Sequence, residues 1–208
     1  MTKYSNFRAH PWHGISAGEE APGKVTCYIE IVPTDTVKFE VDKESGILRV
    51  DRPQKYSSLC PALYGFVPQT YCGDGVGALC AKSMGRDHVE GDGDPIDICV
   101  LTERQILHGD ILVSAIPVGG FRLLDGDEAD DKIIAVLEGD AVYGKITSIA
   151  DVPTGLIDRL KHYFLTYKEI PNHTKEPKIQ VTDVYDRNVA LEVLKQSMVD
   201  YTALTSAK

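Results

Sequence analysis

Three aspartates lie within six residues in the middle of the chain, directly at the start of an apolar run. Asp92, Asp94 and Asp97 overlap the beginning of the run Ile96–Leu101. Two carboxylates about 4 Å apart repel each other by about 4 kcal/mol at an effective dielectric of about 20. The stretch therefore predicts either a solvated turn, since Asp, Gly and Pro are common turn residues, or a site that gathers cations.

A calcium-binding loop of the EF-hand type is excluded by the spacing. That loop needs Asp or Asn at its fifth position and Gly at its sixth, where this chain has Ile96 and Asp97. Asp92 and Asp94 share one face of an extended chain, and Asp97 lies on the other. For all three carboxylates to converge, we expect a bulge or turn near Pro95.

A second acidic cluster precedes another apolar run, Lys132–Leu137. Its carboxylates are Asp125, Asp127, Glu128, Asp130 and Asp131. A hairpin-like sheet could bring the two strand entrances together, and carboxylate oxygens are the ligands that Mg²⁺ and Mn²⁺ prefer. The two clusters together favour a metal site over a solvated turn.

Further polar side chains could bind a substrate beside such metals. The candidates on or near predicted strands and helices are Glu30, Lys38, Glu40, Arg52, Tyr64, Lys132, Tyr167 and Lys168. Lys38 and Glu40 share parity on one strand, as residues facing the lumen of a polar barrel would. Each residue alone is typical of a surface charge or a core aromatic. Jointly they predict a pocket for a polyanion with several phosphoryl oxygens.

Composition narrows the class of protein. The chain has 208 residues, 43% hydrophobic and 25% charged, which is typical of one globular domain spanning residues 1–208. Its net charge, 22 − 31 = −9, argues against a general nucleic-acid binder. No apolar stretch approaches the ~18 residues of a membrane span, and no signal peptide is evident, so we expect a cytoplasmic protein. Five cysteines without a CxxC pair predict reduced thiols.

Hydrophobic periodicity predicts an α+β fold: a twisted antiparallel sheet, closed into an OB-like β-barrel, with two principal helices packed on it. The expected strands are Val25–Val32, Val37–Val41, Ile47–Val50, Ile96–Leu101, Ile111–Ile116, Lys132–Leu137 and Lys178–Val184, the first three forming a meander. One helix is expected from Thr154, its possible N-cap, and another contains Leu191, Leu194 and Met198.

Two segments lie outside this pattern. Gln69–Gly91 is glycine-rich and predicts an inserted functional or partner-binding loop, in which Cys72 and Cys80 pack rather than bind zinc or oxidise. Residues 1–23 predict an N-terminal arm containing HPWHG (His10–Gly14). Its two histidines could bind a metal, but two ligands make no site, so we expect a packed arm.

Several of these motifs, in the same order, resemble those of soluble family I inorganic pyrophosphatases. The Asp92–Asp97 run matches the family's Asp-x-Asp-Pro-x-Asp signature. The other matching segments are VKFEVDKESGILRVDR (Val37–Arg52), YGFVP (Tyr64–Pro68), DEADDK (Asp127–Lys132) with Asp125, and HYFLTYK (His162–Lys168). The resemblance extends from about Cys27 to Lys168; the arm and the Gln69–Gly91 segment depart from it.

The resemblance implies hydrolysis of pyrophosphate to two orthophosphates by direct attack of a metal-activated water. Asp94 would accept the proton of that water. Asp92, Asp97 and Asp130 would hold the activating metal, Asp125 and Asp130 a further one, and Glu30 and Glu40 would act mainly through water. The residues expected to grip the phosphates are Lys38, Arg52, Tyr64, Lys132, Tyr167 and Lys168.

The resemblance also implies several Mg²⁺ ions per site, with Mn²⁺ or Zn²⁺ as possible substitutes, and a homo-oligomer, commonly a hexamer. Pyrophosphate is the expected partner, and neither nucleic acid nor membrane is. Two other classes stay open on the residues alone. One is a phosphatase with an aspartyl nucleophile, although such a pair usually follows an apolar strand; the other is a barrel-type module that binds oligonucleotides or sugars.

Overall fold

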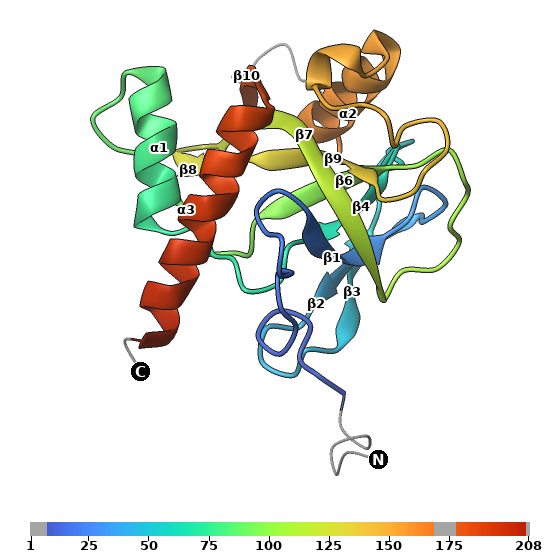
Figure 1. The fold of residues 1–208 in the computed structure, drawn as a ribbon, viewed down its shortest axis with the longest axis horizontal. Helices are drawn as coiled ribbons and strands as arrows, with labels where there is room; N and C mark the ends of the chain where they lie inside the picture. The colour runs from blue at the N-terminus through green and yellow to red at the C-terminus, as the bar shows by residue number, and fades with distance from the viewer. Residues whose placement is uncertain (1–7, 169–177, 207–208) are drawn as a thin grey trace.

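The computed structural model describes residues 8–168 and 178–206, and within these ranges the chain has an α+β fold (Figure 1). The strands are β1 (Val25–Ile31), β2 (Val37–Val41), β3 (Leu48–Pro53), β4 (Leu63–Phe66), β5 (Glu90–Gly91), β6 (Asp97–Leu101), β7 (Ile111–Asp125), β8 (Glu128–Ala129), β9 (Lys132–Leu137) and β10 (Ile179–Asp186). The helices are α1 (Asp74–Met84), α2 (Thr154–Thr166), α3 (Arg187–Ser206) and a short 3₁₀ turn, η1 (Ile149–Asp151).

Eight of these strands form one mixed sheet that closes on itself. The order is β1-β4-β6-β9-β7, and β1 also pairs with β7, so these five strands make a ring. The α+β class is confirmed. The prediction of an antiparallel sheet was wrong, because β6 pairs with β9 in parallel, as β5 does with β8. Alternation along one strand carries no information about its neighbour's direction; the OB-like character of the ring stays a prediction.

The predicted meander of the first three strands was also wrong in part. β2 and β3 form a separate two-stranded sheet, whereas β1 pairs with β4 and β7. Lys43–Gly46 supplies the turn between β2 and β3, and Gly46 adopts a positive φ of 70° there. The hairpin register places Lys38 directly opposite Arg52.

The segment Gln69–Gly91, predicted as an irregular loop, contains helix α1, so the described chain has three α-helices rather than two principal ones. Its glycines concealed the helix, because glycine is a poor helix former. Here they have a packing purpose: a Cβ at Gly75 would collide with Gln196 and Asp200 of α3, and one at Gly77 with the carbonyl of Val89. In Figure 1, α1 lies beside α3.

The two predicted helices are confirmed, with α2 beginning at Thr154 and α3 at Arg187. Thr154 is not the N-cap, however; Pro153 holds that position and offers no side-chain acceptor. Both helices bury one face. Leu160 and Phe164 of α2 and Leu194 of α3 are almost completely buried.

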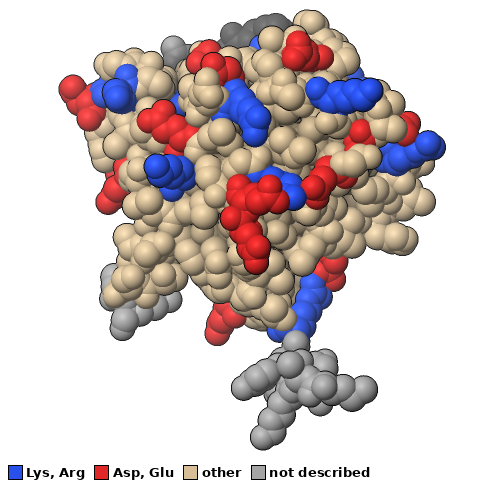
Figure 2. Space-filling view, in the orientation of Figure 1, with Lys and Arg blue, Asp and Glu red and all other residues tan. Residues whose placement is uncertain are grey.

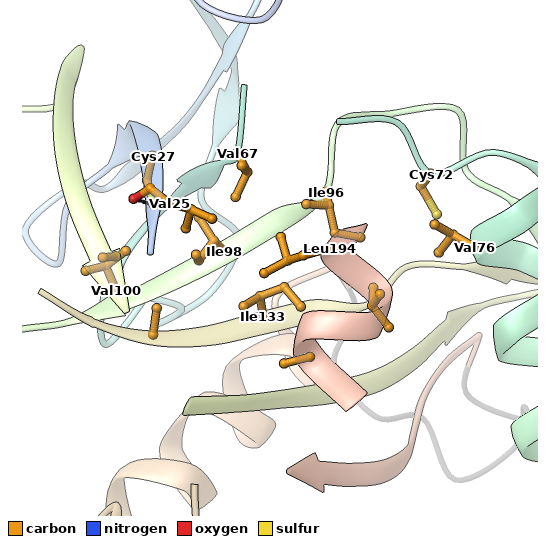
Figure 3. Close-up of a cluster of buried hydrophobic side chains, with 14 of the residues drawn as sticks. Val25, Cys27, Val67, Cys72, Val76, Ile96, Ile98, Val100, Ile133 and Leu194 are labelled. Carbon is orange, nitrogen blue, oxygen red and sulfur yellow. Dashed lines mark hydrogen bonds between the residues drawn. The ribbon is translucent and has the colours of Figure 1, made fainter. Parts of the chain in front are cut away.

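The core divides into layers on the two sides of the sheet. One cluster lies between the sheet and α1 with α3, where Leu194 points toward Ile96 and Ile133 (Figure 3). The other lies under α2 and contains Phe121 and Phe164. Because β6 and β9 supply residues to both clusters, they are buried on both faces, as parallel strands usually are.

The cysteines are free and buried, and Cys27, Cys72 and Cys80 belong to the first core cluster. Burial raises the pKa of each of these three thiols, so they stay protonated and unreactive. Cys72 and Cys80 are therefore packed in the interior of the protein.

Acidic and basic side chains are interspersed over the face shown in Figure 2, in keeping with a net charge of −9. None of the helices in residues 8–168 and 178–206 combines the length and apolarity needed to cross a membrane.

Gly65 of β4 tests how closely the ring is packed. A Cβ there would collide with the carbonyl oxygen of Tyr28 on β1. We predict that Gly65→Ala lowers the free energy of unfolding by about 1–3 kcal/mol, the usual cost of overpacking. Gly155→Ala in α2 is the control, because nothing lies within 4 Å of its Cβ position; it should raise stability by up to about 1 kcal/mol. Urea unfolding followed by circular dichroism measures both, and equal effects would contradict the packing argument.

Candidate active site

Every residue that the sequence assigns to the site lines one pocket of about 390 Å³. They are Glu30, Lys38, Glu40, Arg52, Tyr64, Asp92, Asp94, Asp97, Asp125, Asp130, Lys132, Tyr167 and Lys168. These residues come from strands β1 to β4, β6, β7 and β9, from the loops before β6 and β9, and from the end of α2. The structure thus brings together residues that are far apart in the sequence.

The parallel pairing of β6 with β9 joins the two acidic clusters. Asp97 at the start of β6 is in register with Lys132 at the start of β9, and Asp130 lies two residues before Lys132. The Nζ of Lys132 contacts both the Asp97 and the Asp130 carboxylates. Tyr64 of β4 donates a hydrogen bond of 2.6 Å to Asp97. The two strand entrances meet as expected, but through parallel strands rather than through a hairpin-like sheet.

Lys132 is the central cation of this arrangement, and its side chain is only 2% exposed. Burial alone would lower the pKa of Lys132, but the Asp130 and Asp97 carboxylates together raise it well above its ordinary value. Lys132 is therefore charged at neutral pH. The side chain of the nearby Asp130 is 12% exposed, and its partial desolvation raises its pKa despite the ammonium beside it.

The aspartate loop, which we define as residues 91–96, turns the first two acids into the pocket. Gly93 adopts a positive φ of 76°, and Asp94 N–H donates to Asp92 Oδ1 at 3.0 Å. Because β6 begins only at Asp97, the strand parity that separated Asp97 from the other two does not apply. Burial, with repulsion from Asp130, raises the pKa of Asp92 to about 8.

The β2–β3 hairpin supplies one wall. Lys38 forms ion pairs with Glu40 at 3.0 Å and with Asp51 at 3.1 Å. The hairpin is attached to β1 through Val41, whose N–H donates to Glu30 Oε1 at 2.6 Å. Burial raises the pKa of Glu30 to about 8, although this hydrogen bond opposes the rise.

Another wall is formed by Tyr167 and Lys168, directly after the C-terminal end of α2. Lys168 Nζ lies 2.5 Å from Asp125 Oδ2 at the end of β7. Tyr167 stacks against Tyr163 and has the Arg52 guanidinium 5.8 Å from its ring centroid. Burial raises the pKa of Tyr64 and of Tyr167, so both phenols keep the proton that a hydrogen-bond donor needs.

The pocket is also lined by Trp12, Lys43 and Asp51, which the sequence did not assign to the site, and by Glu128, which it placed in the second acidic cluster without a role of its own. Lys43 contacts the Asp94 carboxylate. Lys43 and Asp51 fall within the VKFEVDKESGILRVDR run, and Glu128 falls within the second acidic cluster. The signal available in the sequence was therefore that each lies close along the chain to a predicted site residue.

Trp12 comes from the HPWHG segment, which packs on the protein. Its Nε1–H donates to the carbonyl of Thr70 at 2.8 Å, and its ring is stacked on His13, 4.4 Å between centroids. Trp12 also shares a buried cluster with Val41 and Phe66. The HPWHG segment therefore packs against the pocket wall through Trp12.

The donor set suits a hard divalent cation, because the pocket offers carboxylate oxygens and its lining has no His or Cys side chain among the described residues. Within residues 8–168 and 178–206, no three His, Cys, Asp or Glu side chains are grouped as a metal-binding set. Instead, ammonium groups contact Asp94, Asp97, Asp125 and Asp130. The residues thus fit Mg²⁺ in chemistry, and binding would require these side chains to reorient.

Comparisons with known proteins agree with the kind of site that the geometry indicates. The family model described as inorganic pyrophosphatase matches residues 27–202. The chain is 51% identical over 207 residues to the inorganic pyrophosphatase of Chlamydia trachomatis serovar L2, covering 98% of this chain and 99% of the relative.

Solved structures agree. The inorganic pyrophosphatase of Thermus thermophilus superposes with a TM-score of 0.76 at 28% identity, covering 94% of this chain and 99% of that one. The type I inorganic pyrophosphatase of Toxoplasma gondii gives 0.74 at 25% identity, covering 98% and 91%. The fold, the acidic pocket and these matches together define the molecule as a hydrolase. The chain belongs to the inorganic pyrophosphatase family, and the resemblance inferred from its motifs is confirmed.

Lys132 provides the test of the site's electrostatics. Lys132→Met would leave Asp97 and Asp130 buried without their shared cation, so we expect a loss of about 3–5 kcal/mol in unfolding free energy. Lys168→Met is the matched control, because its side chain is 37% exposed and pairs with one carboxylate; about 0–1 kcal/mol is expected. Chemical denaturation without divalent ions measures both variants. Equal losses would show that Lys132 does not hold the two clusters together.

Proposed function

We propose that the chain hydrolyses inorganic pyrophosphate to two orthophosphates in this pocket, by direct attack of a water molecule whose proton passes to Asp94. The observation that carries the proposal is the gathering of both acidic clusters and several cations around one pocket. Membership of the family supports the substrate. The roles of single residues rest on their positions and on the motif resemblance.

The charge of the pocket supports a requirement for metal ions. Its acids are Glu30, Glu40, Asp51, Asp92, Asp94, Asp97, Asp125, Glu128 and Asp130, and its cations are Lys38, Lys43, Arg52, Lys132 and Lys168. With all of them ionised the balance is 5 − 9 = −4, and with Glu30 and Asp92 protonated it is 5 − 7 = −2. Either charge disfavours pyrophosphate, itself an anion, until divalent cations enter. Two Mg²⁺ ions would neutralise the larger of the two.

Asp92, Asp97 and Asp130 would hold one ion, and Asp125 with Asp130 another. Glu30 and Glu40 would act through intervening water. When bound, these ions polarise phosphoryl oxygens and lower the pKa of a nearby water molecule. An all-oxygen donor set favours Mg²⁺ or Mn²⁺ over Zn²⁺, which more often takes nitrogen or sulfur ligands.

The cations and phenols of the walls would grip the substrate. Lys38 and Arg52 face it from the hairpin, Lys132 and Tyr64 from the sheet, and Tyr167 and Lys168 from α2. These donors would orient the phosphoryl groups for the attacking water and offset the charge on their oxygens. Phosphoryl transfer depends on such placement more than on covalent chemistry by the protein.

Asp94 is suited to accept the proton. It lies on the aspartate loop, and it contacts Lys43 where both side chains are partly exposed, Lys43 to 52% and Asp94 to 39%. Asp97 and Asp130, by contrast, are engaged by the buried Lys132. A carboxylate outside that network can take up and release a proton without disturbing the two buried acids.

The function itself is tested by release of orthophosphate from pyrophosphate. We expect release with Mg²⁺, none after EDTA, and recovery when Mg²⁺ is restored. Two outcomes would contradict the proposal: no release combined with retention of oligonucleotides, or a trapped phospho-aspartate on Asp92 or Asp94.

Asp94→Asn tests the proton acceptor. The amide keeps the size of the side chain but cannot accept the proton, so we predict a fall in kcat of about 10²–10⁴-fold with an unchanged melting temperature. The control is Asp127→Asn, because the Asp127 side chain is fully exposed and outside the pocket lining. Turnover of Asp94→Asn close to that of the parent would rule out this role.

The proposal extends to the assembly and location of the enzyme. A cytoplasmic location is supported by the free, buried cysteines, because disulfides are rare in that compartment. A homo-oligomer is supported by the motif resemblance, and exposed Leu59, Leu107 and Val142 are side chains that a subunit contact could cover. Sedimentation of the purified protein decides between monomer and hexamer.

A further inference from the structure

We infer that Asp200 of α3 is a positioning residue for the aspartate loop. It would act through a short bridge, residues 71–73, near the start of the segment Gln69–Gly91. The inference rests on the proposed function, because it concerns the placement of Asp94 and Asp130. It assigns a purpose to α1, whose own side chains are outside the pocket lining.

The inner side of the bridge holds both acidic clusters by their backbones. Cys72 N–H donates to the carbonyl of Asp94 at 2.7 Å, and Gly93 N–H donates to the carbonyl of Cys72 at 3.0 Å. The Cys72 thiol donates to the carbonyl of Ala129 at 3.2 Å, the residue before Asp130. One buried residue thus ties the aspartate loop to β8.

The outer side of the bridge is held by α3. Tyr71 N–H donates to the carbonyl of Ser197 at 2.9 Å. Asp200 Oδ2 accepts hydrogen bonds from Gly73 N–H at 3.2 Å and from Val76 N–H at 3.0 Å. These N–H groups at the start of α1 have no intrahelical partner, and Gly73 has no side chain to cap them. Gly73 holds the N-cap position of α1, and Asp200 of another helix supplies the carboxylate that accepts from these N–H groups.

Close packing makes the bridge a rigid connection. A Cβ at Gly91 would collide with the carbonyl of Cys72, and one at Gly75 with Asp200 and Gln196. Gln196 donates to the other oxygen of Asp200 at 2.8 Å. Figure 3 shows Cys72 and Val76 side by side, and both belong to the core cluster under the sheet. A displacement of the start of α1 is consequently passed to Cys72 and on to Asp94.

The experiment compares two aspartates that each cap the start of a helix, Asp200 from another helix and Asp186 from the residue just before its own. Asp186 Oδ1 accepts from Asn188 N–H at 2.8 Å and Val189 N–H at 3.2 Å at the start of α3, and Asp186 is outside the pocket lining. Asp200→Ala and Asp186→Ala each remove a carboxylate that accepts from two backbone N–H groups. A purely structural role predicts the same outcome for both.

We expect Asp200→Ala to lower kcat for pyrophosphate about tenfold with little change in KM, because misplaced catalytic groups slow chemistry more than they weaken binding. Asp186→Ala should keep the kcat of the parent even where its melting temperature falls as far. Asp200→Asn should restore kcat, since the amide oxygen can still accept from Gly73 and Val76. A kcat that falls equally in both alanine variants, or in neither, overturns the inference.

Asp94→Asn, measured alone and combined with Asp200→Ala, separates this inference from the proposed function. Because Asp200 is argued to act through the aspartate loop, Asp200→Ala should lower kcat less in the Asp94→Asn background than in the parent. Full tenfold additivity contradicts the route through Asp94. If Asp94→Asn alone has the parent's kcat, the proposed proton acceptor fails, whatever Asp200→Ala does.

Discussion

The site depends on one buried cation between two carboxylates. The Lys132 side chain is almost completely shielded from water, and most of the Asp97 and Asp130 side chains is shielded as well. Desolvating charges is costly, and mutual attraction offsets that cost only where the geometry is held firmly. The parallel ladder between β6 and β9 holds it, because it sets Asp97 opposite Lys132. The ring of strands and both core clusters serve, in this sense, to keep that register.

Much of the site could be predicted from the sequence, and the reason is local. Each acidic cluster stands at the entrance of an apolar strand, and Lys38 and Glu40 share parity on a charged strand, so the polar residues stood out against their surroundings. The motif resemblance then selected Tyr64, Tyr167 and Lys168 from many similar side chains. Trp12 and Lys43 were missed because their place in the pocket depends on how the arm and the hairpin turn fold back.

The fold was harder to predict from the sequence where long-range contacts determine it. Strand direction within the sheet depends on which neighbour a strand meets, so the mixed character of the ring was not visible in alternation. Helix α1 was hidden for a related reason. Its glycines disfavour a helix in isolation, and the group that caps it, Asp200, is 127 residues from Gly73. Only the folded chain supplies the partner that makes this helix stable.

The separation of the β2–β3 hairpin from the ring divides the proposed phosphate-binding groups between two sheets. Lys38 and Arg52 are carried by the small sheet, while Tyr64 and Lys132 belong to the ring. The Val41–Glu30 hydrogen bond joins the two sheets in the protein itself. A pyrophosphate ion held by all four side chains would therefore be a second link between them.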